Sequence, residues 1–210
     1  MHLRLKMGKP TWNATLLKSM SENDIFAPFQ YEQQQDYSLV ETETVNDIVY
    51  NRPKPSSPVK NFFLPIKENV TKALQTGKKR IILGAPACDL NALSILDEIY
   101  LDETFTDPAY LKNRKNTLLI GSSCHSHNEH CHCTSYGFHP YPTFNADIAV
   151  SEIGDEIFLE VLSEKGRQFT AENISERQPL SNEEEQILFR LKEKTEKELN
   201  EKNSDLPDYR

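Results

Sequence analysis

The sequence predicts an α/β fold with a parallel or mixed sheet and flanking helices, cysteine-bearing loops at the carboxyl ends of strands, and a charged C-terminal helix. Two short apolar runs, Ile81–Leu83 and Leu118–Ile120, are each followed by a glycine and then a cysteine, in GAPAC and GSSC. Such runs are typical of buried parallel strands. The segment between them contains a helical pattern, and its length of about 30 residues suits a right-handed βαβ crossover.

The first part of the chain is expected to alternate helices and strands. Apolar residues at helical spacing predict the first helix, and Pro28 is expected to break the strand that follows. The expected elements are a helix over 11–23, a broken strand over 24–32, a strand, turn and strand over 33–50, an extended proline-rich loop over 51–60, and a helix that begins at Pro65 and is stopped by Gly77.

The second part of the chain ends in a highly charged segment. Ser181 and Glu184 form a capping box that predicts the start of a last helix, which we expect to run to about residue 202. Its second half is mostly charged, so we expect that half to be a solvated arm or a linker, followed by a tail. The elements before it are a helix after Cys88, a short helix from Asp107–Pro108, and two paired strands around Gly154–Asp155.

Length and composition restrict the class of protein. The 210 residues suit one domain, or one domain with a small appendage, and 37% of them are apolar, which is enough for a core. The formal charge of -8 disfavours non-specific binding of nucleic acid or anionic lipid. No apolar run approaches the roughly 18 residues that span a bilayer, and the N-terminus lacks the apolar stretch of a secretory signal. We therefore expect a cytoplasmic protein without a membrane span.

The cysteines suggest an inorganic site. A disulfide fits poorly, because the cytosol keeps thiols reduced and a bridge between Cys131 and Cys133 would be strained. Four unrelated buried thiols remain an alternative, but three of the four lie within ten residues. We favour a metal or cluster site. Its candidate ligands are Cys88, Cys124, Cys131 and Cys133.

The predicted topology can bring these cysteines together. If both apolar runs are parallel strands, Cys88 and Cys124 lie at the same edge of the sheet, and the loop with Cys131 and Cys133 can close over them. Thiolates bind Zn²⁺ or the iron of an iron–sulfur cluster. The spacing Cys-x₃₅-Cys-x₆-Cys-x-Cys matches neither paired zinc motifs nor a ferredoxin run. Spacing alone therefore leaves zinc and a 4Fe–4S cluster open.

Histidines lie between the cysteines and offer other possibilities. They can bind zinc or iron, or they can be ordinary loop residues, and His132 is the one best placed to approach a metal. A redox enzyme or sensor that uses the pair Cys131 and Cys133 is a further hypothesis. A Cys–His nucleophile is also conceivable, but it needs one activated thiol and not four. The histidines concerned are His125, His127, His130 and His132.

The order of several motifs resembles a known family. These motifs are IFAPF, SPVKNFFLPIKE, GAPACDLNALSILD, DPAYLKNRKNTLLIGSSC, CHCTSYG and ADIAVSEIGDEIFLEV. Over about residues 12–165 the chain resembles the N-terminal region of hydrogenase or sulfhydrogenase beta subunits, a family that includes the corresponding subunit of anaerobic sulfite reductase. All four cysteines fall where that family carries cysteine. The family's Arg-Pro before the first cysteine is replaced here by Pro86–Ala87.

The resemblance implies a function and partners. Such subunits relay electrons through 4Fe–4S clusters between a flavin-containing NAD(P)H partner and a catalytic subunit. It implies one 4Fe–4S cluster on the four cysteines of a non-catalytic subunit, whose partners are a redox subunit (ferredoxin-like or flavin-containing) and a catalytic subunit. The family's two-cluster ferredoxin part has no counterpart here, so it is expected on another chain, unless this protein has a different task. A structural zinc-binding scaffold or assembly subunit is the alternative.

We accordingly divide the chain into two parts. Residues 1–180 are expected to form the α/β iron–sulfur domain, and residues 181–210 the charged C-terminal helix and tail.

Overall fold

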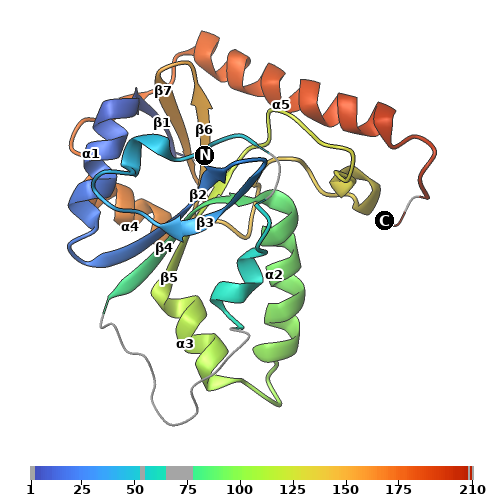
Figure 1. The fold of residues 1–210 in the computed structure, drawn as a ribbon, viewed down its shortest axis with the longest axis horizontal. Helices are drawn as coiled ribbons and strands as arrows, with labels where there is room; N and C mark the ends of the chain where they lie inside the picture. Colours follow the sequence, from blue (N-terminus) through green and yellow to red (C-terminus); the bar gives the residue numbers. More distant parts are fainter. Residues whose placement is uncertain (1–2, 53–54, 65–77, 208, 210) are drawn as a thin grey trace.

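The computed structural model describes residues 3–52, 55–64, 78–207 and 209. These residues form a mixed α/β structure with one eight-stranded sheet in the order β3-β2-β4-β5-β6-β7-β1-β8 (Figure 1). The predicted α/β class is confirmed, while the helix expected from Pro65 lies outside the described residues. The strands are β1 (Leu3–Gly8), β2 (Asn23–Tyr31), β3 (Gln34–Leu39), β4 (Lys79–Pro86), β5 (Thr117–Ser122), β6 (Ile148–Ile153), β7 (Glu156–Val161) and β8 (Gln178–Pro179).

The centre of the sheet is parallel and its flanks are antiparallel. Strands β2, β4, β5 and β6 pair in parallel, whereas β3, β7, β1 and β8 are added by antiparallel pairing. The predicted hairpin around Gly154 is confirmed by the register of β6 and β7. Strand β1 was not predicted. It is short, and its partner β7 is far away in the sequence.

Helices cover both faces of the sheet (Figure 1). The α-helices are α1 (Lys9–Ser19), α2 (Ala87–Tyr100), α3 (Pro108–Asn116), α4 (Glu164–Asn173) and α5 (Asn182–Lys202), and the 3-10 turns are η1 (Val45–Asp47), η2 (Val59–Phe62) and η3 (Cys133–Tyr136). Helix α3 begins at the expected place, where the Asp107 carboxylate accepts a hydrogen bond from the Tyr110 amide at 2.7 Å.

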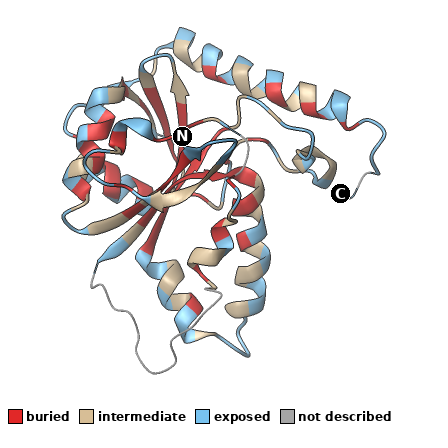
Figure 2. Ribbon diagram, viewed as in Figure 1, coloured by how far each residue is buried: buried red, intermediate tan, exposed pale blue. Residues whose placement is uncertain are grey.

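Each face of the central strands has its own core. Ile81 and Leu83 of β4 pack with Trp12 and Leu16 of α1, whereas Ile82 between them packs with α2 and α3. Side chains of a strand alternate between the two faces, so a continuous apolar run feeds both cores. Figure 2 shows this buried layer through the middle of the molecule.

Three expectations for the first part of the chain were wrong. The first helix begins at Lys9 rather than residue 11 and ends at Ser19, because Pro10 suits the first turn of a helix. Strand β2 runs unbroken through Pro28, which lies beyond the last residue of β2 that pairs with β4. No second strand follows β3 within the described residues up to 50; this segment forms η1 and buries Tyr50 against Trp12.

The expectation that the second half of the last helix is a solvated arm was also wrong. Leu199, near its C-terminal end, is only 1% exposed. The Ser181–Glu184 capping box is present, and Leu188 and Thr195 are buried as well. The second half of α5 is therefore packed against the rest of the molecule. No helix in the described parts of the chain is both long and apolar enough to cross a bilayer.

The start of α5 is joined to β1 by an ion pair, which predicts a pH dependence. Lys6 contacts Glu184, and this contact, helped by the Ser181 amide, lowers the pKa of Glu184 to about 2. A lowered carboxyl pKa stabilises the folded state above the ordinary pKa of about 4.5, and this contribution is lost as the pH falls through about 2. The free energy of unfolding of wild type should exceed that of Glu184→Gln at pH 6, with the difference shrinking below pH 4.5.

Urea denaturation at a series of pH values measures this difference. Glu183→Gln is the matched control, since Glu183 is exposed, lies in the same first turn and takes part in none of the described ion pairs. A constant difference between wild type and Glu184→Gln from pH 6 to pH 2 would contradict the assignment.

Candidate functional site

The parallel register of β4 and β5 places two cysteines side by side. The last residues of these strands, Pro86 and Ser122, are paired with each other. Cys88 and Cys124 each follow two residues later, Cys88 in the first turn of α2 and Cys124 in the loop after β5. Both thiols therefore leave the same edge of the sheet, as the Gly–Cys pattern predicted.

Two glycines allow the strands to approach their neighbours at this edge. Gly84 has a φ of +78° at a register shift in β4, and a Cβ there would lie 2.7 Å from Pro28 Cδ. A Cβ on Gly121 would lie 2.6 Å from both Leu90 Cδ1 and Pro142 Cγ. The close packing of β4 against Pro28 of β2 thus requires Gly84, and the packing of β5 against Leu90 of α2 requires Gly121.

The backbone around Cys124 is firmly held. The Ser123 amide donates to the Val150 carbonyl at 3.0 Å, and the Cys124 amide donates to the Pro140 carbonyl at 2.8 Å. The next amide, of His125, donates to the carbonyl of Asn51 at 3.0 Å. Three successive bonds to three different segments fix the position of this cysteine.

The other two cysteines lie farther along the irregular segment that begins at Cys124. We call this segment, residues 124–137, the cysteine loop. The Cys131 amide donates to the Asn128 carbonyl at 3.2 Å, while the Asn128 amide donates to Cys131 Sγ at 3.4 Å. Cys133 begins η3, which ends at Gly137 in the left-handed conformation, with a φ of +74°. A turn on each side therefore orients these thiols.

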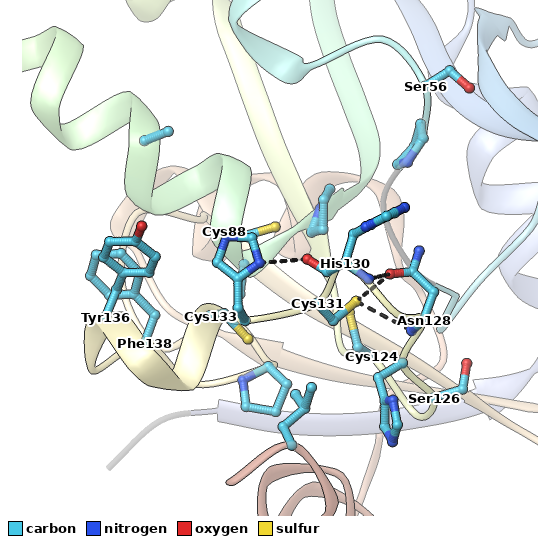
Figure 3. A pocket seen from close by; sticks show the side chains of 18 of the residues that line it. Ser56, Cys88, Cys124, Ser126, Asn128, His130, Cys131, Cys133, Tyr136 and Phe138 are labelled. Atoms are coloured by element: carbon cyan, nitrogen blue, oxygen red, sulfur yellow. Dashed lines mark hydrogen bonds between the residues drawn. The ribbon is translucent and has the colours of Figure 1, made fainter. Parts of the chain in front are cut away.

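All four cysteines line one pocket of about 640 Å³ (Figure 3). Each is partly buried and none forms a disulfide. The rest of the lining is largely apolar and contains no Lys or Arg among the described residues; it includes Ala92 and Ile95 of α2, Leu199 of α5, Tyr136, Phe138 and Pro140. The predicted ligand set is thus gathered around one space by separate parts of the fold.

The thiols are not arranged for a single ion. Within the described residues, no group of three or more His, Cys, Asp or Glu side chains is placed to hold one metal ion. Four sulfur atoms around one zinc, each about 2.3 Å from it, would have to lie about 3.8 Å apart. In a cluster each thiolate binds a different iron, so the sulfur atoms stand farther apart. The donor set of four cysteines that form no disulfide, around a largely apolar pocket, fits a cluster.

Burial and nearby negative charge oppose ionisation of two of these thiols, those of Cys124 and Cys133. Burial raises the pKa of Cys124 far above its usual range, and the negative charges of Cys88, Cys133 and Cys131 raise it further. Burial, assisted by the charge of Cys131, also raises the pKa of Cys133 to about 11. The pocket therefore favours neutral thiols unless positive charge enters it.

The histidines have different surroundings. His132 lines the pocket, and its Nδ1 lies 2.6 Å from the His130 carbonyl, so a contact within the loop orients its ring. The His130 side chain is 84% exposed beside Glu129. His125 Nε2 is buried and has no hydrogen-bond partner in the part of the chain that the structure describes; burial, with the nearby charge of Lys192, lowers the pKa of His125 to about 4.

The remaining histidine and Asp89 have structural contacts. His127 lines the pocket and its Nε2 lies 3.9 Å from Glu198 of α5. Asp89, next to Cys88, is buried, and its Oδ2 accepts a hydrogen bond from the Val59 amide at 2.9 Å. This carboxylate connects the proline-rich segment to the helix that carries Cys88, a role the sequence alone did not indicate.

Comparison with known proteins agrees with the resemblance found in the sequence. The chain is 29% identical over 144 residues to the beta subunit of sulfhydrogenase 2 from Pyrococcus furiosus. The match covers 65% of this chain and 42% of the relative, so the chain spans less than half of that protein. This similarity supports the relationship to hydrogenase beta subunits. No family model matches the chain.

The close approach at Gly121 gives a test of how this edge is packed. Gly121→Ala should lower the free energy of unfolding by about 1–3 kcal/mol, because the added methyl must displace buried groups. Gly8→Ala is the control, since a Cβ at Gly8 would lie 3.7 Å from its nearest neighbour. Urea denaturation measures both variants. Equal stability of Gly121→Ala and wild type would show that the contact is not tight.

Proposed function

We propose that this protein is an electron-transfer subunit of a multi-subunit redox complex and carries one 4Fe–4S cluster. The ligands are Cys88, Cys124, Cys131 and Cys133. The observation that carries the proposal is that four cysteines that form no disulfide, from two strand ends and one loop, line a single pocket. The similarity to the beta subunit of a sulfhydrogenase gives independent support.

Each part of the chain has a distinct task in this proposal. The cluster, when bound, accepts and donates a single electron with little rearrangement. Strands β4 and β5 fix Cys88 and Cys124, and the turns around Asn128 and η3 orient Cys131 and Cys133. Apolar lining residues such as Ile95 and Phe138 limit water around the sulfurs, and solvent access is one determinant of a cluster's potential.

The partners follow from the same relationship. A beta subunit belongs to an assembly, so we place this chain beside a redox subunit, ferredoxin-like or flavin-containing, and a catalytic subunit. A protein that only relays electrons needs no binding site for an organic substrate. A structural zinc site is not favoured, because the thiols of the described residues are not placed around a single ion.

Anaerobic reconstitution with ferrous iron and sulfide tests the cofactor. The purified protein should turn brown and contain about four irons per chain. After reduction it should pass a single electron per chain to a dye of higher potential, as a relay requires. Colourless protein that holds one zinc per chain and no iron would contradict the proposal.

Substitution of one ligand tests the site. Cys124→Ser should lose most of the reconstituted iron, because one of four soft ligands is removed. The neighbouring Ser123→Ala is the matched control: Ser123 is fully buried and its hydroxyl has no hydrogen-bond partner among the described residues, so its removal should leave iron content and stability unchanged. Wild-type iron content in Cys124→Ser would show that Cys124 is not a ligand.

A further inference from the structure

The C-terminal end of α5 lies against the cysteine loop. Lys202 Nζ donates hydrogen bonds to the carbonyls of Glu129 at 2.8 Å and Cys131 at 2.9 Å. The side-chain amide of Asn203 donates to the same Cys131 carbonyl at 3.2 Å. Two neighbouring side chains from the end of one helix thus converge on the backbone of one of the four cysteines.

The residues around this contact extend it on both sides. Leu199, one turn earlier, is buried and lines the pocket itself. Beyond the helix, the Tyr209 amide donates to the Ser135 carbonyl at 2.9 Å, and its ring stacks on Tyr136 with the centroids 5.0 Å apart. Cys131 and Cys133 therefore lie in a loop that the C-terminal segment contacts on both sides of them.

An earlier turn of α5 fixes the helix beside the end of the loop. The Glu196 carboxylate accepts a hydrogen bond from the Tyr141 hydroxyl at 3.1 Å and lies 3.0 Å from His139 Nδ1. Lys192 lies over the Tyr141 ring, with its Nζ 4.8 Å from the ring centroid. The position of α5 is thus set by contacts outside the loop, so the helix can act as a rigid support for it.

The loop needs such support. Apart from the short turn η3 it contains no helix or strand, and loops with few backbone hydrogen bonds are the parts of a protein that open most easily. A hydrogen bond from an ammonium group is stronger than a neutral one, and here it acts together with the bond from Asn203. Loss of these donors would free the Cys131 carbonyl and the thiols on either side of His132.

Lys202 also brings a positive charge to a site that lacks one. No Lys or Arg of the described residues lines the pocket, and four ligated thiolates would place negative charge there. A cation hydrogen-bonded to the backbone of a ligand stabilises the more negative, reduced state, so it raises a reduction potential. Because Lys202 is exposed, salt should weaken this effect.

We infer that α5 is part of the cysteine site: Lys202 and Asn203 are positioning residues that hold Cys131 through its carbonyl, and the charge of Lys202 raises the reduction potential of the bound cofactor. The holding role concerns this chain alone, whereas the effect on potential rests on the proposed function. The second half of α5, which the sequence predicts to be a solvated arm, thus supports the cysteine loop.

Hydrogen exchange of the metal-free protein tests the holding role. Lys202→Met and Asn203→Ala should each exchange faster than wild type in the peptides that cover residues 124–137, by about tenfold if the contact contributes about 1.4 kcal/mol to loop closure. Lys197→Met is the matched control, because Lys197 lies on α5 with its side chain 79% exposed and pairs with exposed Glu201. Unchanged exchange in both site variants would overturn the inference.

Measurements on the reconstituted protein test the second role. Lys202→Met should lower the midpoint potential, and Lys202→Arg, which keeps the charge, should restore it; the shift should be larger at low ionic strength. Both Lys202→Met and Asn203→Ala should lose iron to a chelator about tenfold faster than wild type, as for other residues that support ligands. Equal potentials in Lys202→Met and wild type would overturn the charge effect.

The two sets of results separate the inference from the proposed function. If wild type takes up no iron but the variants exchange faster, the proposed cofactor is wrong and the support of the loop by α5 stands. If wild type takes up about four irons but exchange and iron loss are unchanged in the variants, the cofactor stands and the role of α5 is wrong.

Discussion

The parallel pairing of β4 with β5 is the constraint on which the site depends. Because Pro86 and Ser122 end their strands in register, the chain leaves the sheet twice at one edge, and each exit delivers a cysteine two residues later. The glycines just before the exits allow close contact with Pro28, Leu90 and Pro142, so the strands can pack tightly where the cysteines leave the sheet. Two of the four thiols therefore lie two residues beyond paired central strands, and the other two lie farther along the cysteine loop.

The electrostatics of the pocket complete this arrangement. The buried thiols of Cys124 and Cys133 have raised pKa values, and the lining of the pocket, within the described residues, offers no Lys or Arg to lower them. A positively charged inorganic centre would supply that charge from inside, while Lys202 supplies it from behind the loop. The ends of β4 and β5, the cysteine loop and Lys202 thus belong to one site, although they come from distant parts of the sequence.

The sequence predicted those elements whose position is set by a pattern of neighbouring residues. Apolar runs followed by Gly and Cys predicted β4 and β5, a Gly–Asp turn predicted the hairpin of β6 and β7, and Asp107 before Pro108 predicted the start of α3. Strand β1 could not be predicted, since its short alternating segment gains its partner β7 only in the folded chain. The burial of Leu199 could not be predicted either, because one leucine among charged residues gives no periodic signal. The nearby Lys202 bonds to a backbone carbonyl, and since every residue has a carbonyl, the sequence does not indicate which one is the partner.

The contact between Lys202 and the loop has a consequence for the order of biosynthesis. Translation delivers all four cysteines before it delivers the end of α5, so a nascent chain can fold its central strands while one side of the pocket is still uncovered. When the helix docks, it adds Leu199 to the lining of the pocket and bonds Lys202 and Asn203 to the Cys131 carbonyl, so the surroundings of the cysteines are complete only after the end of α5 has been made.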